Sequence, residues 1–208
     1  MIKIYFLILC FVSIVNAQDF KKDTIELKET ILYDKSTFRL KRLGSDTRTK
    51  TVQIGINSDI NMKNDSEPKY IKEISIPLNA PKKEFTIQRV NFNFSNPLKV
   101  DSIIIRLDLM TEHKGNPNES LLKEPIDIVI RKKDQHENIF TYDLRDLNIK
   151  YADDFQIKLM LLTKVDKPIY FSGALLAKCL YKTEQSTNWE KSPLGITPAI
   201  NADILIKR

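Results

Sequence analysis

The sequence predicts an all-β protein, an antiparallel β-sandwich of jelly-roll type with about ten to twelve short strands. Apolar residues alternate with polar ones in seven separate stretches. Because successive side chains of a strand point to opposite faces, each stretch gives a strand with one dry face. Turn-forming segments such as "LGSD", "NAPKK", "SNP" and "KGNPN" separate the strands. Nowhere do apolar residues keep a helical spacing across eleven or more positions.

The clearest strand is expected at residues 103–109, where isoleucine and leucine at odd positions alternate with mostly polar residues at even positions. Antiparallel sheets that pack through their dry faces produce this pattern. A single helical turn is expected at 144–148, "LRDLN". In chain order, the strands are expected at 25–32, 37–43, 52–56, 71–78, 90–94, 103–109, 126–130, 140–144, 155–161, 168–172 and 200–206.

Residues 1–17 are predicted to be a secretory signal peptide. Lys3 precedes the twelve-residue run "IYFLILCFVSIV", and Val15 and Ala17 place small residues where signal peptidase reads the chain. The run is too short to span a bilayer, which needs roughly twenty apolar residues. Cleavage after Ala17 predicts a protein outside the cytoplasm, in the periplasm, secreted or at the cell surface, with no further segment to anchor it.

Residues 18–208 are expected to form a single β-sandwich domain. Removing seventeen residues from 208 leaves 191, and a chain of that length should bury about 70% of its extended surface without disulfides to support it. Cys10 leaves with the signal peptide, and Cys179 remains as the single cysteine. Within "GALLAKCLY" it is expected to be buried packing rather than a nucleophile.

The net charge argues for some classes of partner and against others. The formal charge of +6 becomes +5 when Lys3 is removed, which permits attraction to anionic polysaccharide or lipid headgroups. The basic residues are scattered, and they do not interleave with aromatic residues as in proteins that stack nucleic-acid bases. No nucleic-acid partner is therefore expected.

No catalytic residue, metal ligand or cofactor is predicted. The two histidines, His113 and His136, fall in the turns "TEHKGNPNES" and "KKDQHEN", without the HxH, HExxH or CxxC spacing of a metal site. Ser172 in "YFSGA" lacks the Gly-x-Ser-x-Gly elbow of a nucleophile. Carboxylates brought together from distant strands would still make a hydrolase or lyase, and this alternative stays open.

Three aromatic residues are the candidate binding residues. Tyr170, Tyr181 and Trp189 fall within twenty positions of one another, and sandwich-shaped carbohydrate modules often hold sugar rings against exposed aromatic faces. The alternative is that Phe171 and Tyr181 fill the core while Trp189 covers the end of a hairpin, since large aromatic side chains dominate core packing.

From about residue 49 to the end, the chain resembles a β-sandwich module of uncharacterised secreted proteins from Gram-negative bacteria. The resemblance lies in "VNFNFSNPLKVDSIIIRLDLM", "GNPNESLLKEPIDIVI", "TYDLRDLNIKYADDFQIKLMLL" and "IYFSGALL", followed by "YKTEQSTNWEKSP". In that group the module often follows a carboxypeptidase-regulatory-like domain, for which residues 18–48 are too short here. The resemblance implies an extracytoplasmic sandwich and names no catalytic residue or substrate.

The leading hypothesis is a non-catalytic module that binds glycan or protein at the cell envelope, or supports its structure. A hydrolase or lyase on a sandwich scaffold is the second hypothesis. The third is a subunit of a surface complex that uses an unpaired sheet edge for strand addition.

Overall fold

The computed structural model describes residues 37–56, 71–165, 167–183, 186, 188–192 and 195–208. The chain divides into two units, Met1–Tyr33 and Asp34–Arg208, and all described residues belong to the second. The predicted signal peptide and the strand expected at 25–32 lie outside the described residues.

The described part is built from antiparallel strands, so the predicted all-β fold class is confirmed, and no α-helix occurs in these residues. The turn expected at 144–148 is the 3-10 helix η2 (Arg145–Leu147), and a second one, η1 (Lys132–Asp134), precedes β8. The strands are β1 (Phe38–Gly44), β2 (Gln53–Ile56), β3 (Ile71–Leu78), β4 (Phe85–Asn93), β5 (Ser102–His113), β6 (Asn116–Ser120), β7 (Ile126–Arg131), β8 (Ile139–Asp143), β9 (Lys150–Tyr151), β10 (Phe155–Leu161), β11 (Ile169–Ala174), β12 (Leu180–Thr183), β13 (Glu190–Lys191), β14 (Thr197–Pro198) and β15 (Ile200–Lys207).

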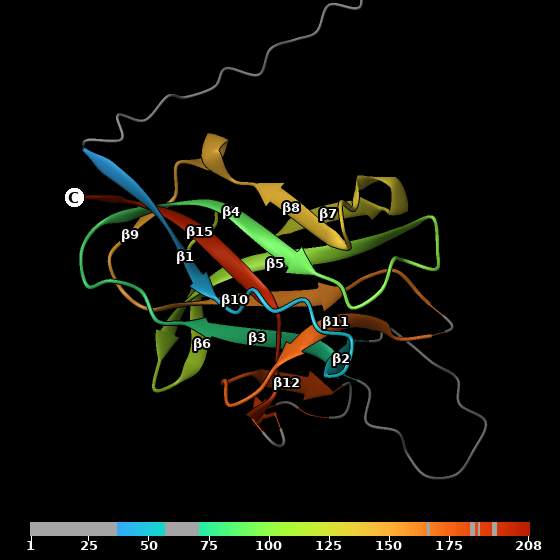
Figure 1. Ribbon diagram of the computed structural model, residues 1–208. Coiled ribbons are helices and arrows are strands. Elements are labelled where there is room, and N and C mark those ends of the chain that lie inside the picture. Colours follow the sequence, from blue (N-terminus) through green and yellow to red (C-terminus); the bar gives the residue numbers. More distant parts are fainter. Residues whose placement is uncertain (1–36, 57–70, 166, 184–185, 187, 193–194) are drawn as a thin grey trace, which may run out of the picture. The chain divides into compact units, whose positions relative to one another are not determined.

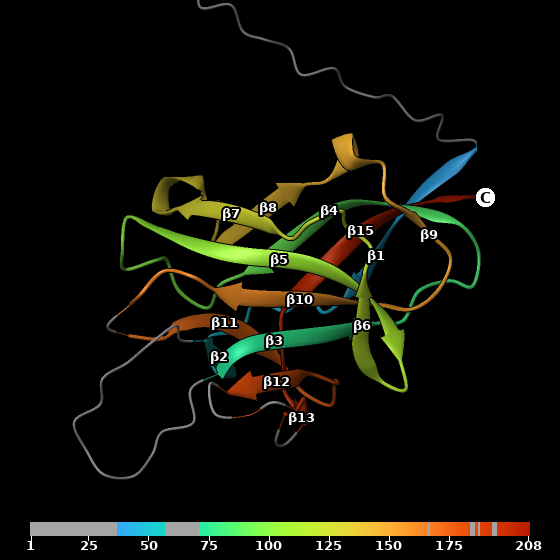
Figure 2. The ribbon, with the colours of Figure 1, turned by 180° about the vertical axis from the view of Figure 1, so that it is seen from behind.

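Two large sheets form two layers, with β4 and β15 in one and β5, β10 and β3 in the other (Figures 1 and 2). The first sheet has the order β1-β15-β4-β8, and β9 also pairs with β4. The second has the order β13-β12-β3-β10-β5-β6, and β7 also pairs with β5. A small third sheet, β14-β11-β2, connects to β4 through a bridge between Phe94 and Phe171. The finer assignment as a jelly roll stays a prediction.

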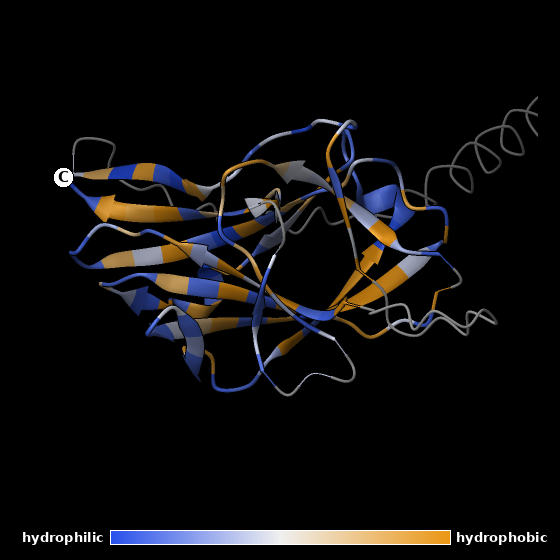
Figure 3. Ribbon diagram, turned by 90° about the horizontal axis from the view of Figure 1, so that it is seen from below, coloured by the Kyte–Doolittle hydropathy of each residue, from blue (hydrophilic) through white to orange (hydrophobic). Residues whose placement is uncertain are grey.

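The core lies between the layers and consists of the dry strand faces that the alternation predicts. Phe155 of β10 is fully buried, and its ring centroid lies 5.9 Å from that of Phe85 in β4. Figure 3 shows the alternation as hydrophobic and hydrophilic bands along the strands. Burying each large aliphatic or aromatic side chain contributes about 1.5–3 kcal/mol, which makes these faces the main source of stability. The four apolar positions of the stretch at 103–109 are all fully buried: Ile103, Ile105, Leu107 and Leu109.

The expectation that residues 111–120 form a simple loop is wrong. Strand β5 continues beyond its buried residues and pairs with β6 in a hairpin, in which His113 stands opposite Asn116. Both turn residues, Lys114 and Gly115, have positive φ, as the two-residue turn that suits the twist of a hairpin requires. Because β6 is largely exposed, it lacks the apolar alternation by which the other strands were recognised.

Candidate functional site

A groove with a volume of about 610 Å³ opens between the connection from β4 to β5 and the connection from β10 to β11. Its walls are joined where the amide of Ser95 donates a hydrogen bond of 3.0 Å to the carbonyl of Tyr170. The buried part of the lining is apolar and includes Phe94, Leu98 and Ile169. Exposed polar side chains form the rim: Gln53, Asn96, Lys99, Lys167 and Tyr170.

Tyr170 is one of the residues that line the groove, and it is 42% exposed. It stands opposite Gly55 on the neighbouring strand β2. A Cβ atom on Gly55 would lie 3.0 Å from Cε1 of Tyr170 and 3.0 Å from Cβ of Pro168. The tyrosine ring therefore packs against the backbone of the glycine at the rim of the groove.

Gly55→Ala is expected to push the Tyr170 ring away and to lower the free energy of unfolding by about 1 kcal/mol, the lower end of overpacking costs, because the ring can rotate outward. Chemical denaturation of Gly55→Ala, Tyr170→Ala and the double variant would test this contact. The two changes should be non-additive, since the overlap with the ring disappears in the double variant and only the close contact with Cβ of Pro168 remains. Strict additivity would contradict the contact.

The other two candidate residues lie in the β12–β13 hairpin and do not line the groove. Tyr181 packs against the core, and its hydroxyl donates a 2.9 Å hydrogen bond to Glu190, which raises the pKa of Tyr181. Trp189 is half-buried, and Nζ of Lys182 lies 4.8 Å from its ring centroid. Because Tyr181 and Lys182 are successive strand residues, their side chains point to opposite faces. Tyr181 and Trp189 are therefore on opposite sides of the hairpin, and the three aromatic residues do not form one site.

The groove rim carries positive charge. Lys99 and Lys167 are both exposed, and neither takes part in the ion pairs found among the described residues. Gln53 and Asn96 add amide donors and acceptors, and no carboxylate occurs among the described residues that line the groove. This combination of apolar floor, aromatic rim and few polar groups is typical of a ligand pocket. Among its described residues, the lining has no carboxyl group of the kind that a glycosidase uses as its general acid.

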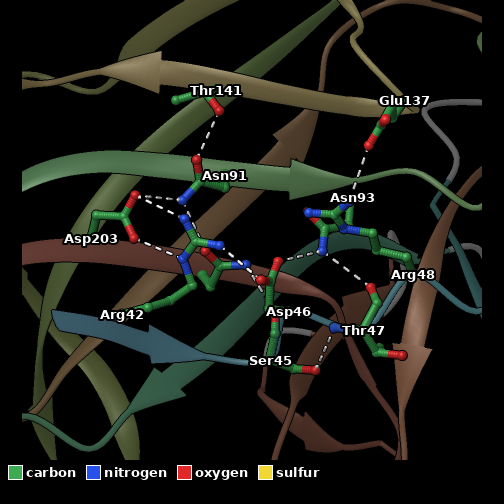
Figure 4. A network of polar contacts seen from close by, with 11 residues as sticks. Arg42, Ser45, Asp46, Thr47, Arg48, Asn91, Asn93, Glu137, Thr141 and Asp203 are labelled. Carbon is green, nitrogen blue, oxygen red and sulfur yellow. Dashed lines mark hydrogen bonds and ion pairs between the residues drawn. The ribbon is translucent and has the colours of Figure 1, made fainter.

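Apart from the groove, a cluster of polar side chains lies on the first sheet, and Figure 4 shows it. It includes Arg42, Asp46, Asn91, Asn93 and Asp203. Arg42 donates from Nε to Asp203 at 2.7 Å and from an Nη atom to Asp46 at 2.8 Å. Asn91 and Asp203 are both buried, and Asn91 donates a hydrogen bond of 3.2 Å to Asp203. Two carboxylates thus share one guanidinium, and the hydrogen bond with Asp203 is the main reason that the pKa of Arg42 is raised.

This cluster supports the fold and is poorly suited to hydrolysis. Partial burial pushes the pKa of Asp46 upward, but hydrogen bonds from Asn93 and Arg42 outweigh it, so the pKa of Asp46 is lowered. A glycosidase general acid needs the opposite shift. Every described carboxyl group with a clearly shifted pKa has it lowered, namely Asp46, Asp127, Asp143 and Asp153.

In the described part of the chain, the cysteine, serine and histidine residues considered from the sequence are not arranged as a reaction centre. Cys179 is buried and has no disulfide partner, and burial raises its pKa to about 12. Ser172 lies in the core with no exposed surface, whereas His113 and His136 are both exposed. The described residues contain no group of three or more His, Cys, Asp or Glu side chains placed to hold a metal ion.

No family model matches the chain, and no match was found among curated proteins or solved structures. The resemblance to the secreted β-sandwich module therefore stays a prediction. In the described residues, no helix has the length and apolar character needed to cross a membrane.

Proposed function

We propose that the protein is an exported, non-catalytic binding module, and that its groove holds a glycan of the cell envelope against Tyr170. The observation that carries the proposal is the exposed Tyr170 ring, braced by Gly55 at the rim of a groove with amide side chains beside it. A sugar ring has an apolar face and a hydroxyl edge. The tyrosine suits the first, and the side chains of Gln53 and Asn96 suit the second.

The proposal includes export by the signal peptide predicted at residues 1–17, since an envelope glycan lies outside the cytoplasm. It favours binding over hydrolysis because the described groove lining offers amines, amides and a phenol but no carboxylate pair.

Assembly by strand addition has less support. The edge strand β1 pairs with β15 along all seven residues, and among the described residues it has no partner on its other side. It carries Arg39, Lys41 and Arg42. Basic side chains on an edge strand discourage pairing with another chain.

Tyr170→Ala is expected to weaken glycan binding by at least about tenfold, which corresponds to about 1.4 kcal/mol of binding free energy. The wild-type chain would be screened on a glycan array, and the strongest ligand titrated calorimetrically into both proteins. Because the ring is partly exposed and stands on a small sheet, the variant should keep its β-sheet circular dichroism and a cooperative melting curve.

Trp189→Ala is the matched control, because it removes a larger aromatic side chain that does not line the groove. It should leave the affinity unchanged. If Trp189→Ala abolishes binding and Tyr170→Ala does not, the hairpin is the site and the groove proposal is rejected. An array on which the wild-type chain binds no glycan would also reject it.

A further inference from the structure

Two leucines project from the turn between β11 and β12. Leu175 is 60% exposed and Leu176 is 97% exposed. Leu176 also has a φ of 59°, in the left-handed region that residues with a Cβ atom rarely adopt. We call these two residues the leucine tip.

The conformation of Leu176 is unfavourable in two ways within the protein itself. A left-handed backbone strains any L residue other than glycine, and asparagine or aspartate tolerate it better than leucine does. An almost fully exposed leucine also gains nothing from burial. Glycine would remove both disadvantages, so the leucine contributes nothing to the stability of the described fold. A strained, exposed apolar residue of this kind points to a contact made outside the chain.

The backbone holds the leucine tip in place. The amide of Ala177 donates a hydrogen bond of 2.9 Å to the carbonyl of Gly195, immediately after Leu176. Cys179 lies two residues after Ala177, and its carbonyl accepts a hydrogen bond of 2.8 Å from the amide of Ser192. The turn is thus attached to the chain that follows β13, and the leucine side chains are presented from a supported backbone.

The charges beside the leucine tip are positive. Lys178 lies two residues after Leu176, and Lys191 lies on β13 opposite Leu180; both lysines are exposed. The sequence has no acidic residue at 167–183 or at 191–202. Two acidic residues lie between those segments: Glu184, which is outside the described residues, and Glu190, which accepts the hydrogen bond of Tyr181.

We propose that the leucine tip inserts into the interface of a lipid bilayer with anionic headgroups, with Lys178 and Lys191 contacting those headgroups. Two apolar side chains bury far less than the roughly 1,000 Å² of a stable protein interface. Each inserted leucine contributes by itself at a bilayer surface, and nearby lysines add attraction to anionic lipid. The association is weak and reversible, and it is independent of the groove and of the glycan proposal.

Co-sedimentation with vesicles tests the proposal. Residues 18–208, without the apolar leader that would bind lipid by itself, would be mixed with vesicles of phosphatidylcholine, with or without phosphatidylglycerol. The wild-type chain should sediment with the anionic vesicles and much less with the neutral ones. Leu176→Gly should lower the partition coefficient by about tenfold, while its melting temperature stays the same or rises because glycine suits the backbone conformation.

Leu40→Ser is the matched control, since Leu40 is as exposed as Leu175 but lies on the edge strand β1. It should leave vesicle binding unchanged. Replacing Lys178 and Lys191 together by glutamine should weaken binding to the anionic vesicles only.

Three results would overturn the proposal: no sedimentation of the wild-type chain with anionic vesicles, equal losses in Leu176→Gly and Leu40→Ser, or full binding by Leu176→Gly. Self-association that Leu176→Gly abolishes, without vesicle binding, would assign the tip to a protein contact instead. Loss of glycan binding in Tyr170→Ala has no bearing on these outcomes.

Discussion

Phe155→Ala is expected to lower the free energy of unfolding by about 3–5 kcal/mol. The Phe155 side chain is fully buried and contacts the layer opposite its own, with its ring 5.9 Å from that of Phe85. Its removal leaves a cavity between the two layers, which relaxation of the rigid strands cannot close. Urea denaturation followed by circular dichroism would measure the loss as a lower midpoint with an unchanged slope.

Phe140→Ala is the control for this prediction. Phe140 is half-buried on β8, at the edge of the first sheet, with its ring 6.0 Å from that of Phe92. Its replacement should cost about 1–2 kcal/mol, because solvent already reaches part of the ring. If Phe140→Ala costs as much as Phe155→Ala, the layers do not depend on packing at Phe155.

The fold class followed from the sequence because one face of each long strand is buried. If such a strand shifted its pairing register by one residue, its whole set of apolar side chains would turn to the solvent face. The packing therefore requires alternation such as that at 103–109. The strands that the sequence did not reveal are short or stand outside the core. The exposed β6 and the two-residue strands β9, β13 and β14 have no long dry face to maintain.

The candidate site was predictable only in part. Tyr170 was selected for its aromatic ring, and it does line the groove. Its partners Gln53, Asn96 and Lys99 come from two other segments of the chain. Only the pairing of β11 with β2, together with the bridge from Phe171 to Phe94 just after β4, brings them together. Strand order of this kind depends on tertiary packing rather than on local pattern. Tyr181 and Trp189 are also close in sequence, but the two-residue period of a strand places them on opposite sides of their hairpin.

The turn "LGSD" at the end of β1 shows how one residue connects the core to the polar outer face. Gly44 has a φ of 93°, and the chain that follows it supplies the carbonyl of Ser45, which accepts a 3.0 Å hydrogen bond from Asn201. The next residue, Asp46, accepts from Arg42. The positions of Ser45 and Asp46 in the cluster of Figure 4 therefore depend on the backbone conformation of Gly44.

Gly44→Ala is expected to lower the free energy of unfolding by about 2–5 kcal/mol, with about 1–2 from the left-handed backbone and about 1–3 from overpacking. An added Cβ would lie 2.8 Å from Cδ2 of the buried Leu78 and 2.9 Å from the carbonyl oxygen of Ile200. The oxygen belongs to the backbone of β15, so it cannot move without disturbing the pairing of β1 with that strand. Thermal and urea denaturation would both report the change.

Gly115→Ala separates the two contributions. Gly115 has a similar φ of 83°, but no atom lies within 4 Å of its added Cβ. It should therefore show the backbone strain alone, about 1–2 kcal/mol, and Gly44→Ala should exceed it by the cost of the overlap. Equal losses of unfolding free energy would mean that Leu78 and Ile200 move aside without cost. The close packing around Gly44 would then not be rigid, which would contradict the prediction.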